Sequence, residues 1–378
     1  MKRAEALVPL LAERALDAEL RRRLPDETID DVRSAGLFPM VVPTSMGGHG
    51  LGVSSLAQST RVMAHADPAA AWTILFLVMH NWMVAKLPPD ARDELFSVDK
   101  PWVLVPAPLA PAGTLTATEG GFVVNGRWEW ATGVHHAEYV LVHARHEAPA
   151  QGTGFAIVPI GDVEIEDVWH TAGMRATGSD AVRLRQVFVP ARRVVSGYEL
   201  LYGGDAIPGD GMSRLPVPPV LALTAAAPAL GAAEAATALY RERIAGRVLA
   251  YSQGTRAIDQ ATAHARLGQV SAELAAARAL WDGALAELEG CVGMDEVPVA
   301  RRMAMRLAAS TTVRMARRVI AEIADGSGGS VYFEQAPFQR LQRDVEVLKG
   351  HVIFDWDRTT ELAGRVALGL DLQPSDMV

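Results

Sequence analysis

The stretch GFVVNGRWEWATGVHHAEYVLV, residues 121–142, decides the fold class of this 378-residue chain. It begins and ends with short runs rich in Val, Phe and Leu, and an Asn-Gly pair and further glycines lie between them. Similar runs recur from Trp102 to Val195 at spacings of about ten residues, which is typical of short β-strands joined by turns. We therefore predict a compact β domain in the middle of the chain.

The sequence on both sides of this β domain has the period of α-helices. From Ala4 to about Val98, apolar residues recur three and four positions apart. A Pro- and Gly-rich connection at residues 203–219 leads to long Ala- and Leu-rich segments that run to Leu370, where we expect four or five long helices. Because strands and helices do not alternate, a doubly wound sheet is excluded. The predicted fold is mostly α with a central β domain.

We divide the predicted fold into three parts. They are an N-terminal helical domain (residues 1–98), a central β-barrel or β-sandwich domain (99–202) and a C-terminal helical bundle (203–378).

Composition narrows the classes of function. The formal charge is -8 and the basic residues are interspersed with acidic ones, so the chain has no basic stripe for nucleic acid. Cys291 is the single cysteine, which excludes an internal disulfide and a multi-thiolate metal site. The apolar run at residues 69–84 contains His80 and Asn81 and is too short to span a bilayer. With no leader at the start of the sequence, we expect a cytoplasmic protein without a membrane partner.

Four strings, taken in order, resemble the acyl-CoA dehydrogenase superfamily along nearly the whole chain. They are SAGLFPMVVPTSMGGHGL (34–51), GRWEWATG (126–133), GMRATGSDAVRLRQVFVP (173–190), and a Gly328-Gly329 turn followed by Arg343-Asp344. The resemblance implies the fold of that superfamily, which is a β domain between two helical domains.

One position separates the reactions within this superfamily. Acyl-CoA dehydrogenases carry the Glu that removes the substrate α-proton nine residues after the Arg of the Arg-Asp pair, and here that position is Val352, which cannot accept a proton. The preceding His351, and His80 in the first domain, match histidines of the two-component flavin-dependent monooxygenases of the same fold.

This second resemblance implies a reaction and its partners. Such an enzyme takes reduced flavin, FMN or FAD, from a separate flavin reductase. It then uses O2 to form a C4a-hydroperoxide that oxygenates a small organic substrate at an aromatic carbon, a sulfur or an amine nitrogen.

Three residues of the β domain are candidates for contact with the flavin ring. By resemblance, Thr132 faces flavin N5 and is a catalytic as well as a cofactor-binding candidate. Trp130 is expected beside the ring, although alternation along a strand would place Trp128 and Trp130 on one face, as in an ordinary core cluster. Trp169 is a further neighbour of the same kind.

Two histidines are the remaining catalytic candidates. His351 is expected on a helix among Val347, Leu348 and Phe354, where the residues alone indicate a core histidine and the resemblance indicates a proton acceptor. For His80, a catalytic role and a packing role stay open. The other histidines of the β domain lack acidic partners at metal-ligand spacing, and we expect them to face solvent or turns: His135, His136, His143 and His146. No metal site is predicted.

The flavin phosphate needs an arginine, a hydroxyl or a glycine-exposed amide. The resemblance matches this role to Arg266 and to the turn Gly328, Gly329 and Ser330. In the superfamily this end of the flavin lies against a neighbouring subunit, so a homotetramer is implied.

Two other functions fit parts of the sequence. The first is an acyl-CoA dehydrogenase or oxidase whose base has moved to Glu234 or Glu242. The second is a catalytically inactive oligomeric scaffold of the same fold, although Thr132, His80 and His351 together argue against a decayed site.

Overall fold

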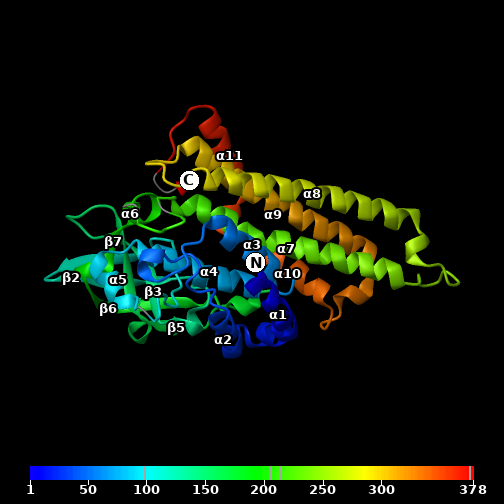
Figure 1. Ribbon diagram of the computed structural model, residues 1–378, viewed down its shortest axis with the longest axis horizontal. Coiled ribbons are helices and arrows are strands. Elements are labelled where there is room, and N and C mark those ends of the chain that lie inside the picture. Colours follow the sequence, from blue (N-terminus) through cyan, green and yellow to red (C-terminus); the bar gives the residue numbers. More distant parts are fainter. Residues whose placement is uncertain (98, 205–206, 213, 374–375) are drawn as a thin grey trace.

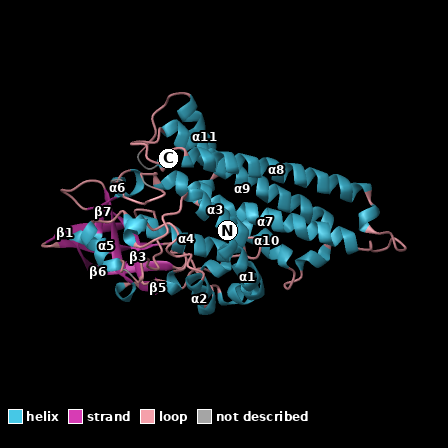
Figure 2. Cartoon of the chain, in the orientation of Figure 1, coloured by secondary structure: helices cyan, strands magenta, loops and turns pink. Residues whose placement is uncertain are grey.

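The computed structural model describes residues 1–97, 99–204, 207–212, 214–373 and 376–378. Within these ranges the chain runs from a helical part through one sheet into a long helical bundle (Figure 1). The sheet lies at one end of an elongated molecule, and the bundle extends to the other end (Figure 2). The predicted fold class, mostly α with a central β domain, is confirmed.

The N-terminal part is helical, as predicted. Its helices are α1 (Lys2–Arg21), α2 (Asp26–Ser34), α3 (Val53–Met63), α4 (Pro68–Ala85) and α5 (Pro89–Leu95). Helix α4 is the core of this part, because every one of its residues is buried. It begins at Asp67, whose carboxylate accepts hydrogen bonds from the amides of Ala69 and Ala70 at 2.8 and 3.1 Å. A helix surrounded on all sides has no polar face, which explains its almost uninterrupted apolar sequence.

The central sheet has seven strands within the described residues. They are β1 (Gly113–Thr118), β2 (Gly121–Trp128), β3 (Tyr139–His146), β4 (Thr153–Pro159), β5 (Glu164–Glu166), β6 (Ala181–Pro190) and β7 (Val194–Ser196). Their order is β5-β6-β2-β1-β3-β4-β7, and all neighbours are antiparallel except β1 and β3. The stretch 121–142 therefore supplies β2 and the start of β3, and the turn between them faces the helices.

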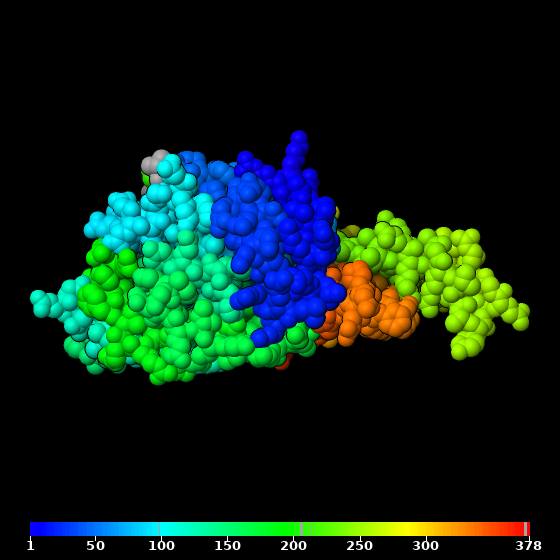
Figure 3. Space-filling view, turned by 90° about the horizontal axis from the view of Figure 1, so that it is seen from below, coloured from blue at the N-terminus to red at the C-terminus, as the bar shows by residue number. Residues whose placement is uncertain are grey.

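The C-terminal part holds the longest helices. They are α6 (Gly197–Tyr202), α7 (Val217–Gly246), α8 (Ala261–Glu289), α9 (Val299–Ser327), α10 (Pro337–Leu348) and α11 (Trp356–Ala367). Small residues let α7 approach its neighbours, since a side chain at Gly231 would overlap the carbonyl of Arg61 on α3. The turn between α7 and α8, yellow-green in Figure 3, projects from the body of the molecule.

The domain boundaries that we expect from the sequence remain predictions. Among the described residues, the C-terminal bundle has three long helices, α7 to α9. We expected four or five, but α10 and α11 have only 12 residues each. The expected boundary at Val98 lies outside the described residues, as do residues 205, 206 and 213 of the connection at 203–219. The boundary expected after residue 202 coincides with the end of α6.

Two helices are long and apolar enough to cross a membrane by composition alone, α4 and α7. The apolar windows of these helices are 100% and 89% buried inside the protein, so both are core helices here.

Candidate functional site

One face of α4 carries a row of rings. Trp72, Phe76 and His80 are spaced by four residues, so they lie on the same side of the helix. The ring centroids of Trp72 and Phe76 are 4.8 Å apart, and those of Phe76 and His80 are 5.3 Å apart. The local sequence thus builds an aromatic surface about 12 Å long, given the rise of about 1.5 Å per residue.

His351 joins this row from a second element. Its ring centroid lies 5.5 Å from that of Trp72, edge-on at 70°. Our prediction that His351 lies within a helix was wrong, because α10 ends at Leu348 and His351 begins the 3-10 turn Val352–Phe354. Gly350 lies between the two, and its low helix propensity favours this break.

Burial keeps both histidines neutral at neutral pH. It lowers the pKa of His351 to about 4, with a further contribution from the nearby Arg306 guanidinium. Burial also lowers the pKa of His80 to about 4, although the hydrogen bond to the Val105 carbonyl acts in the opposite direction. Both side chains can therefore exchange hydrogen bonds with a ligand as neutral imidazoles.

The hydrogen bonds assign opposite tautomers to the two rings. Nδ1 of His80 lies 2.7 Å from the carbonyl oxygen of Val105, which can only accept, so Nδ1 carries the proton and Nε2 is an acceptor. Nδ1 of His351 instead accepts from the amide of Ile353 at 3.3 Å, so its Nε2 is a donor. In this arrangement His80, rather than His351, is ready to accept a proton.

The turn after β2 presents Trp130 and hides Trp128. β2 ends at Trp128, which is 1% exposed, whereas Trp130 has a φ of 63° and is 60% exposed. The expected strand alternation, with both indoles on one face, was therefore wrong, because the chain leaves the strand between them. Trp130 is left as a large exposed apolar ring beside Thr132.

Thr132 belongs to a chain of buried hydroxyls. Its Oγ1 lies 2.9 Å from Oγ of Ser179, which lies 2.7 Å from Oγ1 of Thr177. Oγ1 of Thr177 and the indole Nε1 of Trp169 both donate to the carbonyl oxygen of Met174, each at 2.9 Å. One loop thus orients both Thr132 and Trp169.

This loop region lies against the aromatic helix. A side chain at Gly133, where φ is 74°, would come within 3.2 to 3.4 Å of Thr73 and Leu77 on α4. Thr73 and Leu77 directly follow Trp72 and Phe76 in sequence, so the structure brings Thr132 to the helix that carries His80. Thr132 therefore lies beside the helix that carries His80, and His351 contacts the other end of the row of rings on that helix.

The glycine turn after α9 is surrounded by arginines. Gly328 has a φ of 72°, which glycine adopts without strain. Arg243 on α7 donates to the carbonyl of Ser327 at 2.8 Å and to Oγ of Ser330 at 2.6 Å, and Arg247 donates to the same carbonyl at 2.8 Å. Arg266 on α8 lies against Gly326, within reach of the same turn. Burial lowers the pKa of Arg243, and the positive charge of Arg247 lowers it further. A bound anion would therefore stabilise the charged form of Arg243.

Sequence reasoning missed Arg243 and Arg247. The segment RERIAGR (241–247) places the two four residues apart on one helix face, which is a signal for a shared cation site. Nothing in that spacing alone shows that the face meets the glycine turn some 80 residues later.

Comparisons with known proteins place this site in a family. The model of the acyl-CoA dehydrogenase C-terminal domain matches residues 223–356. The chain is 32% identical to a pigment production hydroxylase of Rhodococcus sp., over 100% of this chain and 97% of that protein. It is 30% identical to the flavin-dependent monooxygenase oxygenase subunit HsaA of Mycobacterium tuberculosis, over 96% and 94% of the two chains. The chain belongs to the family of flavin-dependent monooxygenase oxygenase subunits.

A solved structure agrees with this assignment. XiaF from Streptomyces sp., in complex with FADH2 and glycerol, superposes on this oxygenase with a TM-score of 0.92 at 30% identity, over 99% of this chain and 96% of that one. The predicted superfamily, the enzyme class and the use of reduced flavin are confirmed, and the oxygenase is a flavin-dependent oxidoreductase of the monooxygenase type.

The residues of the oxygenase fit a flavin. Trp130 offers an exposed ring beside Thr132, and the arginines at the glycine turn offer charge for phosphate. These two groups are far apart in one chain: Thr224 of α7 contacts Met79 of α4, and Arg243 lies nineteen residues further along α7, about 28 Å by helix rise. One protomer does not bring all the predicted cofactor residues together.

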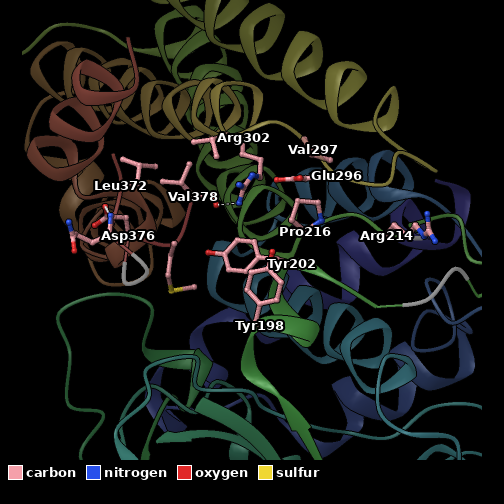
Figure 4. A pocket seen from close by; sticks show the side chains of 13 residues that line it. Tyr198, Tyr202, Arg214, Pro216, Glu296, Val297, Arg302, Leu372, Asp376 and Val378 are labelled. Atoms are coloured by element: carbon pink, nitrogen blue, oxygen red, sulfur yellow. Dashed lines mark hydrogen bonds between the residues drawn. The ribbon is translucent and has the colours of Figure 1, made fainter. Parts of the chain in front are cut away.

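A cavity of about 410 Å³ lies between α6, the start of α9 and the C-terminal residues (Figure 4). Tyr198 and Tyr202 of α6 form one wall, and the guanidinium of Arg302 stands 5.2 Å from the Tyr202 ring. One helical turn further on, Arg306 donates to the carbonyl oxygens of Asp376 at 2.7 Å and of Val352 at 3.4 Å. Arg306 therefore ties a wall residue of the cavity to the residue next to His351.

Among the other histidines, His143 corrects our expectation, whereas His135 and His136 lie in the 3-10 turn Val134–His136. His143 is buried and stacks on Phe155 with centroids 4.1 Å apart, so it does not face solvent. His135 has an acidic partner that the sequence did not indicate, Asp180 at 2.7 Å. Within the described residues no group of three or more His, Cys, Asp or Glu could hold a metal ion.

The alternative bases are poorly placed. Glu234 pairs with Arg61 at 2.5 Å and with His65 at 2.7 Å. Burial alone would raise its pKa, but these partners hold the pKa below its ordinary value, so the carboxylate is occupied. Glu242 is exposed on the far half of α7. Neither joins the row of rings on α4.

Proposed function

We propose that this oxygenase hydroxylates a small phenolic substrate on the aromatic face of α4, between His80 and His351. The observation that carries the proposal is the continuous row His351–Trp72–Phe76–His80, which offers flat apolar surface with a neutral imidazole at each end. Relatives named p-hydroxyphenylacetate 3-hydroxylase and resorcinol hydroxylase support a phenol over the sulfur or amine substrates that the sequence left open.

The protein's own groups have complementary tasks. His80, with Nδ1–H fixed by Val105, accepts the phenolic proton at Nε2. His351 donates from Nε2 to an oxygen of the bound substrate. When bound, the reduced flavin supplies oxygen activation and the transfer of one oxygen atom. The buried row of rings excludes water from that step.

The flavin site is shared between copies in this proposal. Thr132, Trp130 and Trp169 contact the ring, whereas Arg266, Gly328, Gly329 and Ser330, joined by Arg243 and Arg247, hold the phosphate of FMN or FAD that is bound at a neighbouring protomer. A homotetramer provides that neighbour, and the long span along α7 supports it. A separate flavin reductase supplies the cofactor, and we place the enzyme in the cytoplasm.

Isotope labelling tests the proposal. The purified protein receives reduced FMN or FAD from an added reductase under 18O2, with resorcinol, p-hydroxyphenylacetate or dibenzothiophene as the substrate. We expect one labelled oxygen in a catechol-type product, measured by mass spectrometry. Labelled sulfoxide from dibenzothiophene with no phenol product would move the function to sulfur oxidation, and hydrogen peroxide as the sole product from every substrate would contradict the proposal.

A further inference from the structure

Asp344 is a buried carboxylate that no part of the proposed chemistry uses. It lies on α10, is 3% exposed, and its Oδ1 accepts a hydrogen bond from the amide of Met174 at 2.5 Å. Its Oδ2 is buried and has no hydrogen-bond partner among the described residues. A buried oxygen in that state is costly for an ionised group.

Met174 is the hub of the loop that orients the flavin-facing side chains. Its φ of 53° is in the left-handed region, which a non-glycine residue adopts only when its surroundings hold it there. Its amide is held by Asp344, and its carbonyl receives the hydrogen bonds of Trp169 and Thr177. Through Ser179 the same chain continues to Thr132.

The loop is pressed onto α10 at this point. A side chain at Gly173 would overlap the carbonyl of Arg343, so glycine allows the backbones to touch. Arg343 adds a hydrogen bond to the carbonyl of Ala172 at 2.8 Å. Asp344 is therefore the centre of a contact between the β domain and the helix that ends just before His351.

We propose that Asp344 is a positioning residue that fixes the flavin-facing loop 169–179 to α10. The proposal rests on the proposed roles of Trp169 and Thr132. By holding Met174 in its left-handed conformation, Asp344 sets the indole of Trp169 and, through Thr177 and Ser179, the hydroxyl of Thr132. The chain continues from α10 to His351. Asp344 therefore connects the loop that orients Trp169 and Thr132 to the helix that precedes His351.

Asp344 does this as a neutral carboxyl group. The groups that surround it are Asp67 at the start of α4, Glu19 of α1, and Arg340 and Arg343 of α10. Burial raises the pKa of Asp344 well above its ordinary value, and the charge of Asp67 raises it further. The hydrogen bond from the Met174 amide and the charge of Arg343 act in the opposite direction but are smaller than these two effects together. A carboxyl whose pKa is raised on folding binds an extra proton in the folded state, so stability falls as pH rises above about 4 until the folded pKa is passed.

Two substitutions of Asp344 test the proposal in the flavin-free protein. Asp344→Asn keeps an oxygen for the Met174 amide and needs no proton, so its melting temperature should fall less than that of the wild type between pH 5 and pH 9. Asp344→Leu removes the acceptor, so amide hydrogen exchange in residues 169–179 should become about tenfold faster or more, the effect of an unpaired buried amide. Asp357→Asn, an exposed carboxylate on α11, is the matched control and should match the wild type in both measurements.

The outcomes separate this proposal from the proposed flavin site. Unchanged exchange in Asp344→Leu would overturn the positioning role, and the same pH slope for Asp344→Asn and the wild type would overturn the neutral state of Asp344. Faster exchange with an unchanged dissociation constant for reduced flavin would instead overturn the flavin-facing roles of Trp169 and Thr132. If Asp344→Leu is insoluble, the exchange measurement is made on Asp344→Ala, which also lacks the acceptor and carries the same expectation.

Discussion

At the scale of single residues, the two histidines are chemically distinct although both are neutral, His80 being buried and His351 half-buried. Their difference comes from the partner of Nδ1, a carbonyl for His80 and an amide for His351. The sequence could show neither partner, because Val105 is 25 residues from His80 and the turn after α10 breaks the expected helix. The tautomers therefore favour His80 over His351 as the proton acceptor in our proposal, whereas the sequence suggested His351.

Glutamine substitutions distinguish the two roles. His351→Gln keeps a side-chain N–H donor and should retain much of the product yield, whereas His80→Gln cannot take up a proton and should lower product formation by roughly 100- to 10,000-fold. The measurement is the ratio of hydroxylated product to hydrogen peroxide at saturating reduced flavin. A larger loss in His351→Gln would return the proton acceptor to His351.

Acid should destabilise the protein through His80. Its pKa is lowered on folding from 6.5 to about 4, so the unfolded chain binds a proton that the folded chain refuses in this interval. Stability from this group is complete above pH 6.5 and is lost as pH falls toward 4. Between pH 6.5 and pH 4, the free energy of unfolding of the wild type should fall by roughly 3 kcal/mol more than that of His80→Gln. Urea denaturation at each pH measures this difference. His264→Gln, at an exposed position on α8, should behave as the wild type, and parallel curves for His80→Gln would contradict the prediction.

At the scale of elements, periodicity predicted the order of helices and strands well and the ends of elements badly. The helical, β, helical order follows from apolar spacing, which is a local property. Strand β2 ends at Trp128, and the chain then turns toward Asp180. There the amide of Ala131 donates a hydrogen bond to the carbonyl oxygen of Asp180. The contact between Met174 and Asp344 joins residues 170 positions apart. Such contacts have no signature in a single sequence.

The contact between the β domain and α10 should be intolerant of one added methyl group. Gly173→Ala would drive a Cβ into the Arg343 carbonyl, so the loop and helix must separate, at a cost of about 1–3 kcal/mol. A clear fall in melting temperature should follow, together with weaker binding of reduced flavin. Gly161→Ala, in the 3-10 turn Ile160–Asp162 where a Cβ meets nothing within 4 Å, is the control and should melt like the wild type. Equal melting of the two variants would show that the contact can relax.

At the scale of the whole molecule, the candidate site is divided. The row of rings and Thr132 lie where the β domain meets α4, whereas the arginines and the glycine turn lie toward the far half of α7. The sequence named members of both groups by resemblance but could not show their separation, which depends on how far α7 runs without interruption. In the proposed arrangement, a flavin that touches both groups bridges two copies of the chain.

Mixing two inactive variants tests this division. Arg243→Ala combined with Arg247→Ala removes the phosphate contacts, and His80→Gln impairs the catalytic face, so each variant alone should be nearly inactive. In a hybrid oligomer formed by co-expression, a protomer with intact His80 can receive its phosphate contacts from a neighbour with intact Arg243 and Arg247. Random pairing should restore about a quarter of the wild-type activity, measured as labelled product, in a particle of about four times the 40.4 kDa chain mass by light scattering. If each site lay within one protomer, mixing would restore no activity, because every protomer in the hybrid carries one defect. A monodisperse monomer that binds flavin tightly would contradict the shared site directly.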